Sequence, residues 1–284
     1  MNFFLHIVAI TSMTLMHALG YNLVFGKAKI FHFGPIGTSI CAGYATFIAL
    51  QYSGTYWIGV PAGIAAAMLL SLLFAWLSFR LDPDGLGIMT IAVHLAMVTV
   101  VINWTSLTRG ALGLPRIPRM PLLTTPLSFA AVVFVIAALC VWGMWTLERS
   151  AFGRQLEALA EQEWHAKSLG VSRVRTHLIA FLICGFAGFL ANLFYHQYLY
   201  LVHPSDFGFP IFIFYMMLVI AGKPGSTVGI VASTVLLTLV KEGLRFVPLP
   251  SEILGPTRLL LFGVILLVAV WIRRDSLFPK KRTI

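Results

Sequence analysis

Charged residues are scarce in this sequence of 284 residues: Asp, Glu, Lys and Arg make up 11% of it, against about 25% in a soluble domain. Hydrophobic residues account for 59%. This composition excludes a water-soluble globular protein. Several separated apolar runs of about 20 residues predict instead an all-α, polytopic integral membrane protein.

Cysteine is also scarce: Cys41, Cys140 and Cys184 fall inside apolar runs without paired spacing, which is typical of small hydrophobic residues rather than of disulfides or metal ligands. The eight histidines show no H-E-x-x-H or comparable ligand spacing. The sequence contains no catalytic constellation and no G-x-x-x-x-G-K-[ST] phosphate loop. We therefore predict a non-enzymatic chain with no metal and no cofactor of its own, so any ATP must bind to another chain.

The net charge of +10 comes from basic residues at the ends of the apolar runs, which indicates membrane topology and not nucleic-acid binding. No cleavable signal peptide is expected, because no basic region precedes the first apolar run. Placing residues 148–175 and the C-terminal tail in the cytoplasm puts the N-terminus outside and most basic residues inside. The inside set includes Lys27, Lys29, Arg80 and Lys223. Three expected outside residues run against the positive-inside rule: Arg109, Arg116 and Arg119.

We expect a single transmembrane domain over residues 1–284 with about nine membrane segments, some of them short or broken. The segments cover residues 3–25, 35–52, 56–79, 87–105, 127–147, 176–200, 209–221, 226–246 and 259–272. The seventh is short for a full crossing, because a helix needs about 20 residues to cross the hydrocarbon core.

The longest stretch of mixed charge, residues 148–175, is named the charged loop; it separates two apolar segments and must lie in water. Residues 155–169 contain no Gly or Pro and predict one helix, which Gly170 ends in the left-handed conformation. The apolar side of this helix holds Leu156, Leu159, Ala160, Trp164 and Ala166, and the polar side holds Glu157, Glu161 and His165. Glu163 and Lys167 form an i,i+4 pair of favourable orientation.

Such a helix could lie on lipid headgroups or dock on a soluble partner. Its acidic residues Glu157, Glu161 and Glu163 would be repelled by anionic lipid, which favours the partner. Four apolar side chains contribute about 1.5–3 kcal/mol each when fully buried, enough for a stable contact.

Two Gly-rich stretches, residues 26–43 and 221–229, interrupt the helical pattern within apolar surroundings. Broken backbone at membrane depth is tolerated where protein or a water-filled cavity surrounds it, so both stretches are candidates for a solute path. Ordinary turns between helices are the alternative. The candidate path residues are His32, Gly34, Gly37, Gly43, His94, Gly222, Gly225 and Ser226.

Other polar and small residues in the apolar segments have structural explanations. His94 lies mid-span and is explained more simply by packing than by a proton relay. Gly59 and Gly63 form a small-xxx-small pair that predicts close helix packing. Lys241 and Glu242 end the eighth segment and are expected to extend to the membrane surface.

The charged loop also carries a family resemblance. Its segment A-L-A-E-Q-E-W-H-A-K-S-L-G-V resembles the cytoplasmic coupling segment of permease subunits of branched-chain amino acid ABC transporters. Further similar stretches follow in family order: L-G-Y-N-L-V-F-G, L-T-R-G-A-L-G-L-P-R-I-P, S-A-F-G-R, H-P-S-D-F-G-F and A-G-K-P-G-S-T-V-G. They cover nearly the whole chain, and the second of them is similar to the outside loop of the second of two paired permeases.

The resemblance implies an ATP-driven importer of branched-chain amino acids or a related small polar solute in the bacterial inner membrane. The implied partners are a second permease that forms a heterodimer with this chain, two cytoplasmic ATPase subunits that bind ATP and Mg²⁺, and an external solute-binding protein. The residues expected to couple to the ATPase are Arg154, Leu156, Leu159, Glu161, Glu163, Trp164, Ala166, Leu169 and Gly170. The sequence departs from the family pattern at Lys29, His32, Pro35, Lys223 and Pro224. These departures lie in the candidate path, so urea, amides and other amino acids are alternative solutes.

Two other classes of function are less consistent with the residues. A secondary transporter or channel would need a relay of ionisable groups within the membrane, and only His94 is central. A membrane-embedded enzyme would need clustered catalytic or metal-binding side chains, which the sequence does not show.

Overall fold

The computed structural model describes residues 3–246 and 251–277, and these residues are almost entirely helical. The long helices are α1 (Phe3–Tyr21), α2 (Gly34–Ser53), α3 (Tyr56–Arg80), α4 (Pro83–Asn103), α6 (Pro126–Arg149), α9 (Arg173–Leu199), α10 (Phe209–Ala221), α11 (Thr227–Gly243) and α12 (Ser251–Leu277). The short elements are η1 (Asn22–Lys27), α5 (Thr105–Thr108), η2 (Gly110–Leu112), η3 (Pro121–Leu123), α7 (Ala151–Glu161), α8 (Glu163–Ser168), η4 (Pro204–Phe207) and η5 (Leu244–Phe246). Two strands of two residues each, β1 (Leu114–Pro115) and β2 (Leu201–Val202), pair antiparallel.

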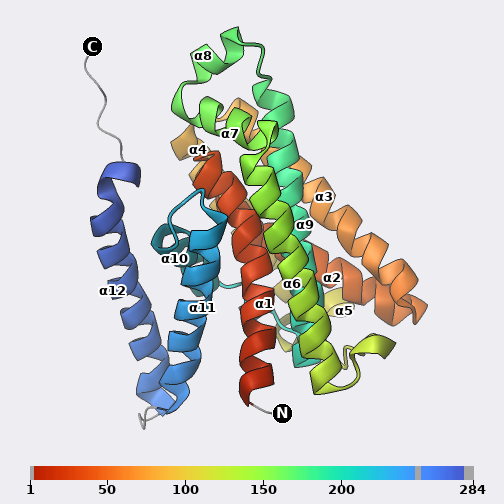
Figure 1. Cartoon of the computed structure of the whole chain (residues 1–284). Helices are drawn as coiled ribbons and strands as arrows, with labels where there is room; N and C mark the ends of the chain where they lie inside the picture. Colours follow the sequence, from red (N-terminus) through yellow and green to blue (C-terminus); the bar gives the residue numbers. More distant parts are fainter. Residues whose placement is uncertain (1–2, 247–250, 278–284) are drawn as a thin grey trace.

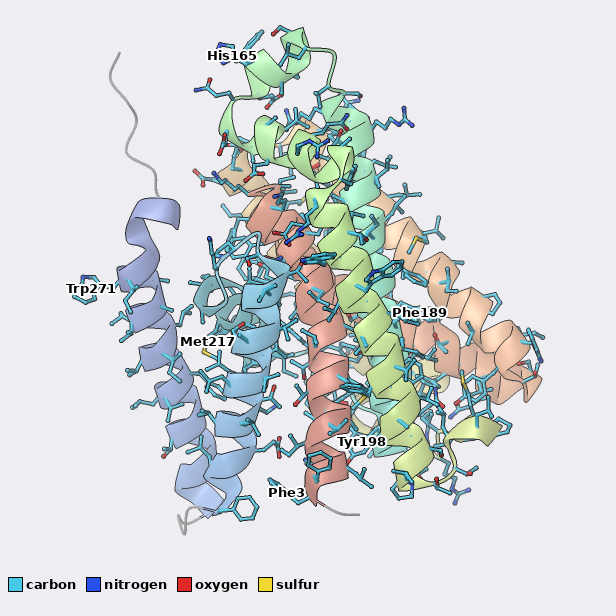
Figure 2. All side chains as sticks on the ribbon, in the orientation of Figure 1. Phe3, His165, Phe189, Tyr198, Met217 and Trp271 are labelled. Carbon is cyan, nitrogen blue, oxygen red and sulfur yellow. The ribbon has the colours of Figure 1, made fainter. Side chains whose placement is uncertain are left out.

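Five helices within the described residues are long and apolar enough to cross a membrane: α1 continued by η1, then α3, α4, α6 and α9. Large apolar side chains such as Leu69, Leu139 and Trp271 are exposed on the outside of the bundle, and Figure 2 shows Trp271 pointing away from it. Exposed apolar surface of this extent suits lipid and not water. The all-α membrane fold is therefore confirmed, and the number of nine crossings stays a prediction.

Short polar side chains cap the N-termini of several of these helices. The Asp82 side chain accepts from the Gly85 amide at the start of α4, at 3.1 Å. Thr125 and Ser128 form a reciprocal capping box at the start of α6. Ser226 accepts from the Gly229 amide at the start of α11, at 3.3 Å. Each cap satisfies an amide that the first helical turn leaves unpaired, so the helix boundaries follow from local sequence.

Helix α1 is central to the bundle and packs against α6, α9, α10 and α11 (Figure 1). Helices α2 and α3 form a hairpin, and α9 packs against both. Helix α12 lies at one edge, where it contacts α10.

The two ends of the bundle differ. Helices α7 and α8 cover one end, named the α8 end, and α12 also finishes on that side, whereas α1 starts at the opposite end (Figure 1). Figure 2 places His165 and Phe3 at these opposite ends. The charged loop and the last helix therefore share a side, as the topology prediction requires. Which compartment that side faces stays a prediction.

Gly59 and Gly63 lie where α3 meets α2. A Cβ on Gly63 would stand 1.9 Å from the Thr46 hydroxyl oxygen and 2.7 Å from the Phe189 ring. A Cβ on Gly59 would stand 2.8 Å from the Thr46 carbonyl oxygen. The predicted packing role of this glycine pair is confirmed, because no larger residue fits without moving a helix.

We expect Gly63→Ala to destabilise the fold by about 1–3 kcal/mol, the usual effect of overpacking a close contact. Gly143→Ala on α6 is the matched control, because a Cβ there would have nothing within 4 Å. Thermal unfolding of both variants in detergent, followed by the loss of the monodisperse peak in size-exclusion chromatography, measures the effect. Equal unfolding temperatures for the two variants would contradict the packing account.

Candidate functional site

The charged loop forms two helices and not the single helix predicted over residues 155–169. Helix α7 ends at Glu161, and α8 begins at Glu163 after Gln162 adopts φ −147° and ψ 85°. No Gly or Pro marks this break. The two pieces are attached to different parts of the bundle, α7 through buried leucines and α8 through an ion pair to α9, and these contacts outweigh local helix propensity.

Leu156 and Leu159 are buried, at 0% and 6% exposure, and Leu156 belongs to a cluster with Leu23, Val24 and Phe181. The expectation that these two leucines face a partner protein is therefore wrong. They attach α7 to this chain's own core. The sequence pattern correctly indicates an apolar side but not which neighbour covers it.

The most exposed large apolar side chains of the charged loop are Trp164 and Leu169, at 85% and 83% exposure. Arg154 and Glu161 are also exposed, whereas Ala166 is 2% exposed. Among the predicted coupling residues, Arg154, Glu161, Trp164 and Leu169 are therefore exposed, whereas Leu156, Leu159 and Ala166 are buried.

Glu163 connects α8 to the bundle. Its carboxylate pairs with the Lys167 ammonium at 2.5 Å and with the Arg173 guanidinium at 3.2 Å, which confirms the predicted i,i+4 pair. Arg173 also donates to the Ser78 carbonyl of α3 at 2.9 Å. The hydrogen bond from Lys167 and the nearby Arg173 hold the pKa of Glu163 below its ordinary value. This attachment is therefore present above the ordinary carboxyl pKa and is lost as pH falls through the lowered value.

Gly170 ends α8 as predicted, with φ +84°. The Val171 amide donates to the Ala166 carbonyl and the Gly170 amide to the Lys167 carbonyl, both at 3.0 Å. This pair of bonds is a Schellman motif, in which a left-handed residue suits glycine.

The two Gly-rich breaks meet each other. The Gly225 amide donates to the Asn22 side-chain oxygen at 2.8 Å, and a Cβ on Gly26 would stand 2.6 Å from the Gly225 nitrogen. We name Asn22, Gly26 and Gly225 the junction. The first stretch is interrupted only between η1 and α2, since residues 34–43 belong to α2, and the second is a turn between α10 and α11. The Asn22 side chain thus satisfies one backbone amide of that turn.

Charged side chains connect the junction to the charged loop. The Lys27 ammonium donates to the Glu157 carboxylate of α7 at 3.0 Å. Glu148, at the end of α6, accepts from the Thr227 amide at the start of α11 at 2.9 Å. The loop that carries α8 is therefore attached directly to η1 and α11, the helices that flank the junction.

The remaining candidate path residues fall into separate groups. His32, Gly34, Gly37 and His94 lie around Phe74, since a Cβ on Gly37 would be 3.4 Å from the Phe74 ring and 3.9 Å from the His94 Cα. Gly43 lies apart from them, against His196 and Phe207. Gly222 and Ser226 belong to the turn between α10 and α11, where Gly222 packs on Gly229.

A cavity of about 620 Å³ lies between α1, α2, α9, α10, α11 and α12, and none of the predicted path residues lines it. Its polar lining residues are His6, Thr14, His17, Ser39, Asn192, Tyr195, Tyr198, Asp206, Tyr215, Lys241 and Glu242. Apolar residues such as Ile36, Phe207 and Phe214 complete the wall. The sequence analysis did not predict this site. Thr14 and His17 on α1 and Asn192 on α9 are polar residues within apolar spans, and such residues usually face the interior of a bundle.

A group of polar residues lines the end of the cavity near the start of α1. His6 contacts the Tyr198 hydroxyl at 2.6 Å and the Glu242 carboxylate at 3.1 Å. Glu242 is 2% exposed, so the expectation that it reaches the surface is wrong. A buried carboxylate is retained here because His6 accompanies it, as buried charges require.

Between the cavity and the charged loop the core is packed. The cavity is lined by α1 up to His17, whereas Leu23 and Val24, further along the same helix, pack with Phe74 and Phe181. The cavity therefore belongs to the half of the bundle away from α8, and apolar packing separates it from the α8 end.

A family model described as "Branched-chain amino acid transport system / permease component" matches residues 3–270. The chain belongs to this permease family. The high-affinity branched-chain amino acid transport system permease protein LivM of Escherichia coli (strain K12) is 27% identical over 97% of this chain and 70% of its own length. LivH of the corresponding system of Salmonella typhimurium is 23% identical over 69% of this chain and 70% of its own length. No solved structure gives a significant match.

Another relative is the autoinducer 2 import system permease protein LsrC of Enterobacter sp. (strain 638), 25% identical over 48% of this chain and 43% of its own length.

The family match and the apolar helices show that the permease is a multi-pass inner-membrane subunit of an ABC transporter, as the sequence resemblance implies. Its relatives are permease subunits of transporters with different named solutes, so family membership alone does not identify the solute.

We expect Leu156→Asp to destabilise the permease itself, because the change removes a buried leucine and introduces a carboxylate without a partner. Loss of a buried leucine alone costs about 2–5 kcal/mol. Trp164→Asp on the exposed face of α8 is the control and should leave stability unchanged. Thermal unfolding of the purified variants measures both, and an unaffected Leu156→Asp variant would contradict the inward role of α7.

Proposed function

We propose that this chain is one permease of an ATP-driven importer for branched-chain amino acids or a related small polar solute. The proposed partners are a second permease, two cytoplasmic ATPase subunits that bind ATP and Mg²⁺, and an external solute-binding protein. The α8 end faces the cytoplasm in this arrangement, and the N-terminus lies outside. Similarity to both LivM and LivH supports a paired permease.

The observation that carries the proposal is the attachment of an exposed helix to helices that surround the packed core. Helix α8 presents Trp164 and Leu169 outward, while Glu157 and Glu148 of the same region contact Lys27 and Thr227 near the junction. A partner that moves α8 would therefore move η1 and α11 with it. Because η1 carries part of the packing below the cavity, such movement can open the α8 end.

The mechanism requires two states that a ligand distinguishes, since a ligand shifts an equilibrium only through its different affinity for the two states. ATP bound between the partner ATPase subunits supplies this difference. The structure has the cavity in the half of the bundle away from α8 and packed apolar residues at the α8 end. With the α8 end in the cytoplasm, as proposed, this is the arrangement of an importer before release. Solute enters from the outer half, and release follows when the packed cluster separates.

We expect the double change Trp164→Asp and Leu169→Asp to reduce co-purification of the ATPase at least tenfold. Each apolar side chain contributes about 1.5–3 kcal/mol when buried, and about 1.4 kcal/mol corresponds to a tenfold change in affinity. The matched control is Leu112→Asp with Leu122→Asp, two residues of similar exposure (74% and 81%) in the 104–125 segment. Pull-down of the tagged permease measures the association, and uptake of labelled solute measures transport. Retention of the ATPase by the α8 variant would contradict the docking role.

The orientation is tested by labelling single cysteines with a membrane-impermeant maleimide in a background where Cys41, Cys140 and Cys184 are replaced by alanine. We expect Glu161→Cys to be labelled only after the cells are opened, because α7 faces the cytoplasm. Leu122→Cys should be labelled in intact cells. Labelling of Glu161→Cys from outside would place α8 in the wrong compartment for an ATPase partner.

A further inference from the structure

The inner end of the cavity contains polar atoms that have no partner. His17 Nε2 and Ser39 Oγ are buried and lack a hydrogen-bond partner among the described residues. Both residues line the cavity, at 3% and 2% exposure. Burying a polar atom without a partner is unfavourable, and in native proteins each such atom calls for a ligand, a water molecule or a functional explanation.

These two side chains converge on one place on α9. A Cβ on Gly188 would stand 3.2 Å from Ser39 Oγ and 3.7 Å from His17 Cε1. One turn further along α9, the Asn192 amide nitrogen donates to the Gly188 carbonyl at 2.9 Å. We name His17, Ser39 and Asn192 the polar corner. It takes one residue from each of α1, α2 and α9, and the absence of a side chain at Gly188 leaves it open.

The His17 ring has a defined orientation. It stacks on the Tyr215 ring of α10, with the ring centres 4.1 Å apart and the planes 14° from parallel. Stacking of this kind orients the two ring nitrogens without using either of them in a hydrogen bond. His17 can therefore donate or accept a hydrogen bond at the cavity without reorganising the surrounding helices.

Two ionisable groups of the cavity, His6 and Glu242, lie together near the start of α1, and His6 is 11 residues before His17, a separation of about 16 Å along a helix. Asp206 lies nearer to the corner, because its carboxylate is 4.0 Å from Nδ1 of His196, one turn beyond Asn192 on α9. The polar corner itself contains only neutral hydrogen-bonding groups and an imidazole without an acidic neighbour in the corner. A carboxylate or ammonium placed there would have no counter-charge among the three residues of the corner, and a hydrocarbon would leave His17 and Ser39 unpaired.

We propose that the polar corner binds a neutral hydrogen-bonding group of the solute, such as a carboxamide, urea or hydroxyl group, while the charged end of the cavity faces any zwitterionic part. This inference rests on the proposed importer function and narrows its solute class. Such a preference would distinguish this permease from one that selects a solute with a purely aliphatic side chain. A site that pairs with a polar group discriminates strongly against an analogue that lacks it.

Asparagine and leucine test the proposal, because their side chains have nearly the same shape and differ in carrying a carboxamide or an isopropyl group. The permease is purified with its associated subunits, and thermal protection by each amino acid, by urea and by acetamide gives apparent Kd values. We expect asparagine to bind at least tenfold more tightly than leucine. Ser39→Ala and His17→Phe should each bring the ratio of the two Kd values close to one.

Thr238→Val is the matched control, since Thr238 is also fully buried with an unpaired hydroxyl but does not line the cavity. It should leave the ratio unchanged. Three outcomes would overturn the proposal and leave the corner as a water site. Leucine binds as tightly as asparagine or more tightly, none of the amide or urea probes gives thermal protection, or the ratio of the two Kd values is unchanged in Ser39→Ala. ATP-dependent uptake, measured separately with the α8 variants, shows whether the importer function itself fails.

Discussion

The contact between η1 and the turn before α11 is the constraint on which the rest of the structure depends. A helix interruption leaves backbone groups unpaired, and lipid cannot satisfy them. Here the Asn22 side chain accepts from the Gly225 amide, and Gly26 allows the two backbones to approach. The interruptions therefore need each other, so η1 and the turn before α11 form one unit at the α8 end.

This unit explains how a surface loop can act on an interior cavity. Glu157 and Glu148 attach the charged loop to both sides of the junction, and Glu163 attaches it through Arg173 to α3. A force applied to α8 is thus distributed over several helices at once. The packed cluster of Leu23, Val24, Phe74 and Phe181 lies directly beside these attachments and separates the cavity from the α8 end.

The histidines of the cavity make different contacts, and the sequence alone does not distinguish them. His6 contacts the Glu242 carboxylate, whereas His17 stacks on Tyr215 and keeps a nitrogen without a partner. The two histidines thus line different ends of the cavity. The neighbouring helices determine the role of each histidine, because burial and the available partners set the chemistry of an imidazole.

The sequence by itself determined the membrane fold class, the approximate positions of the long apolar helices, the glycine that ends α8 and the glycine pair between α2 and α3. Each of these depends on composition or on residues a few positions apart, which local physical rules describe. Only the tertiary structure decided that Leu156 faces inward, that α7 and α8 are separate and that the cavity uses His17, Ser39 and Asn192. These depend on contacts between helices far apart in the chain, and a residue's apolar or polar character does not specify which neighbour it meets.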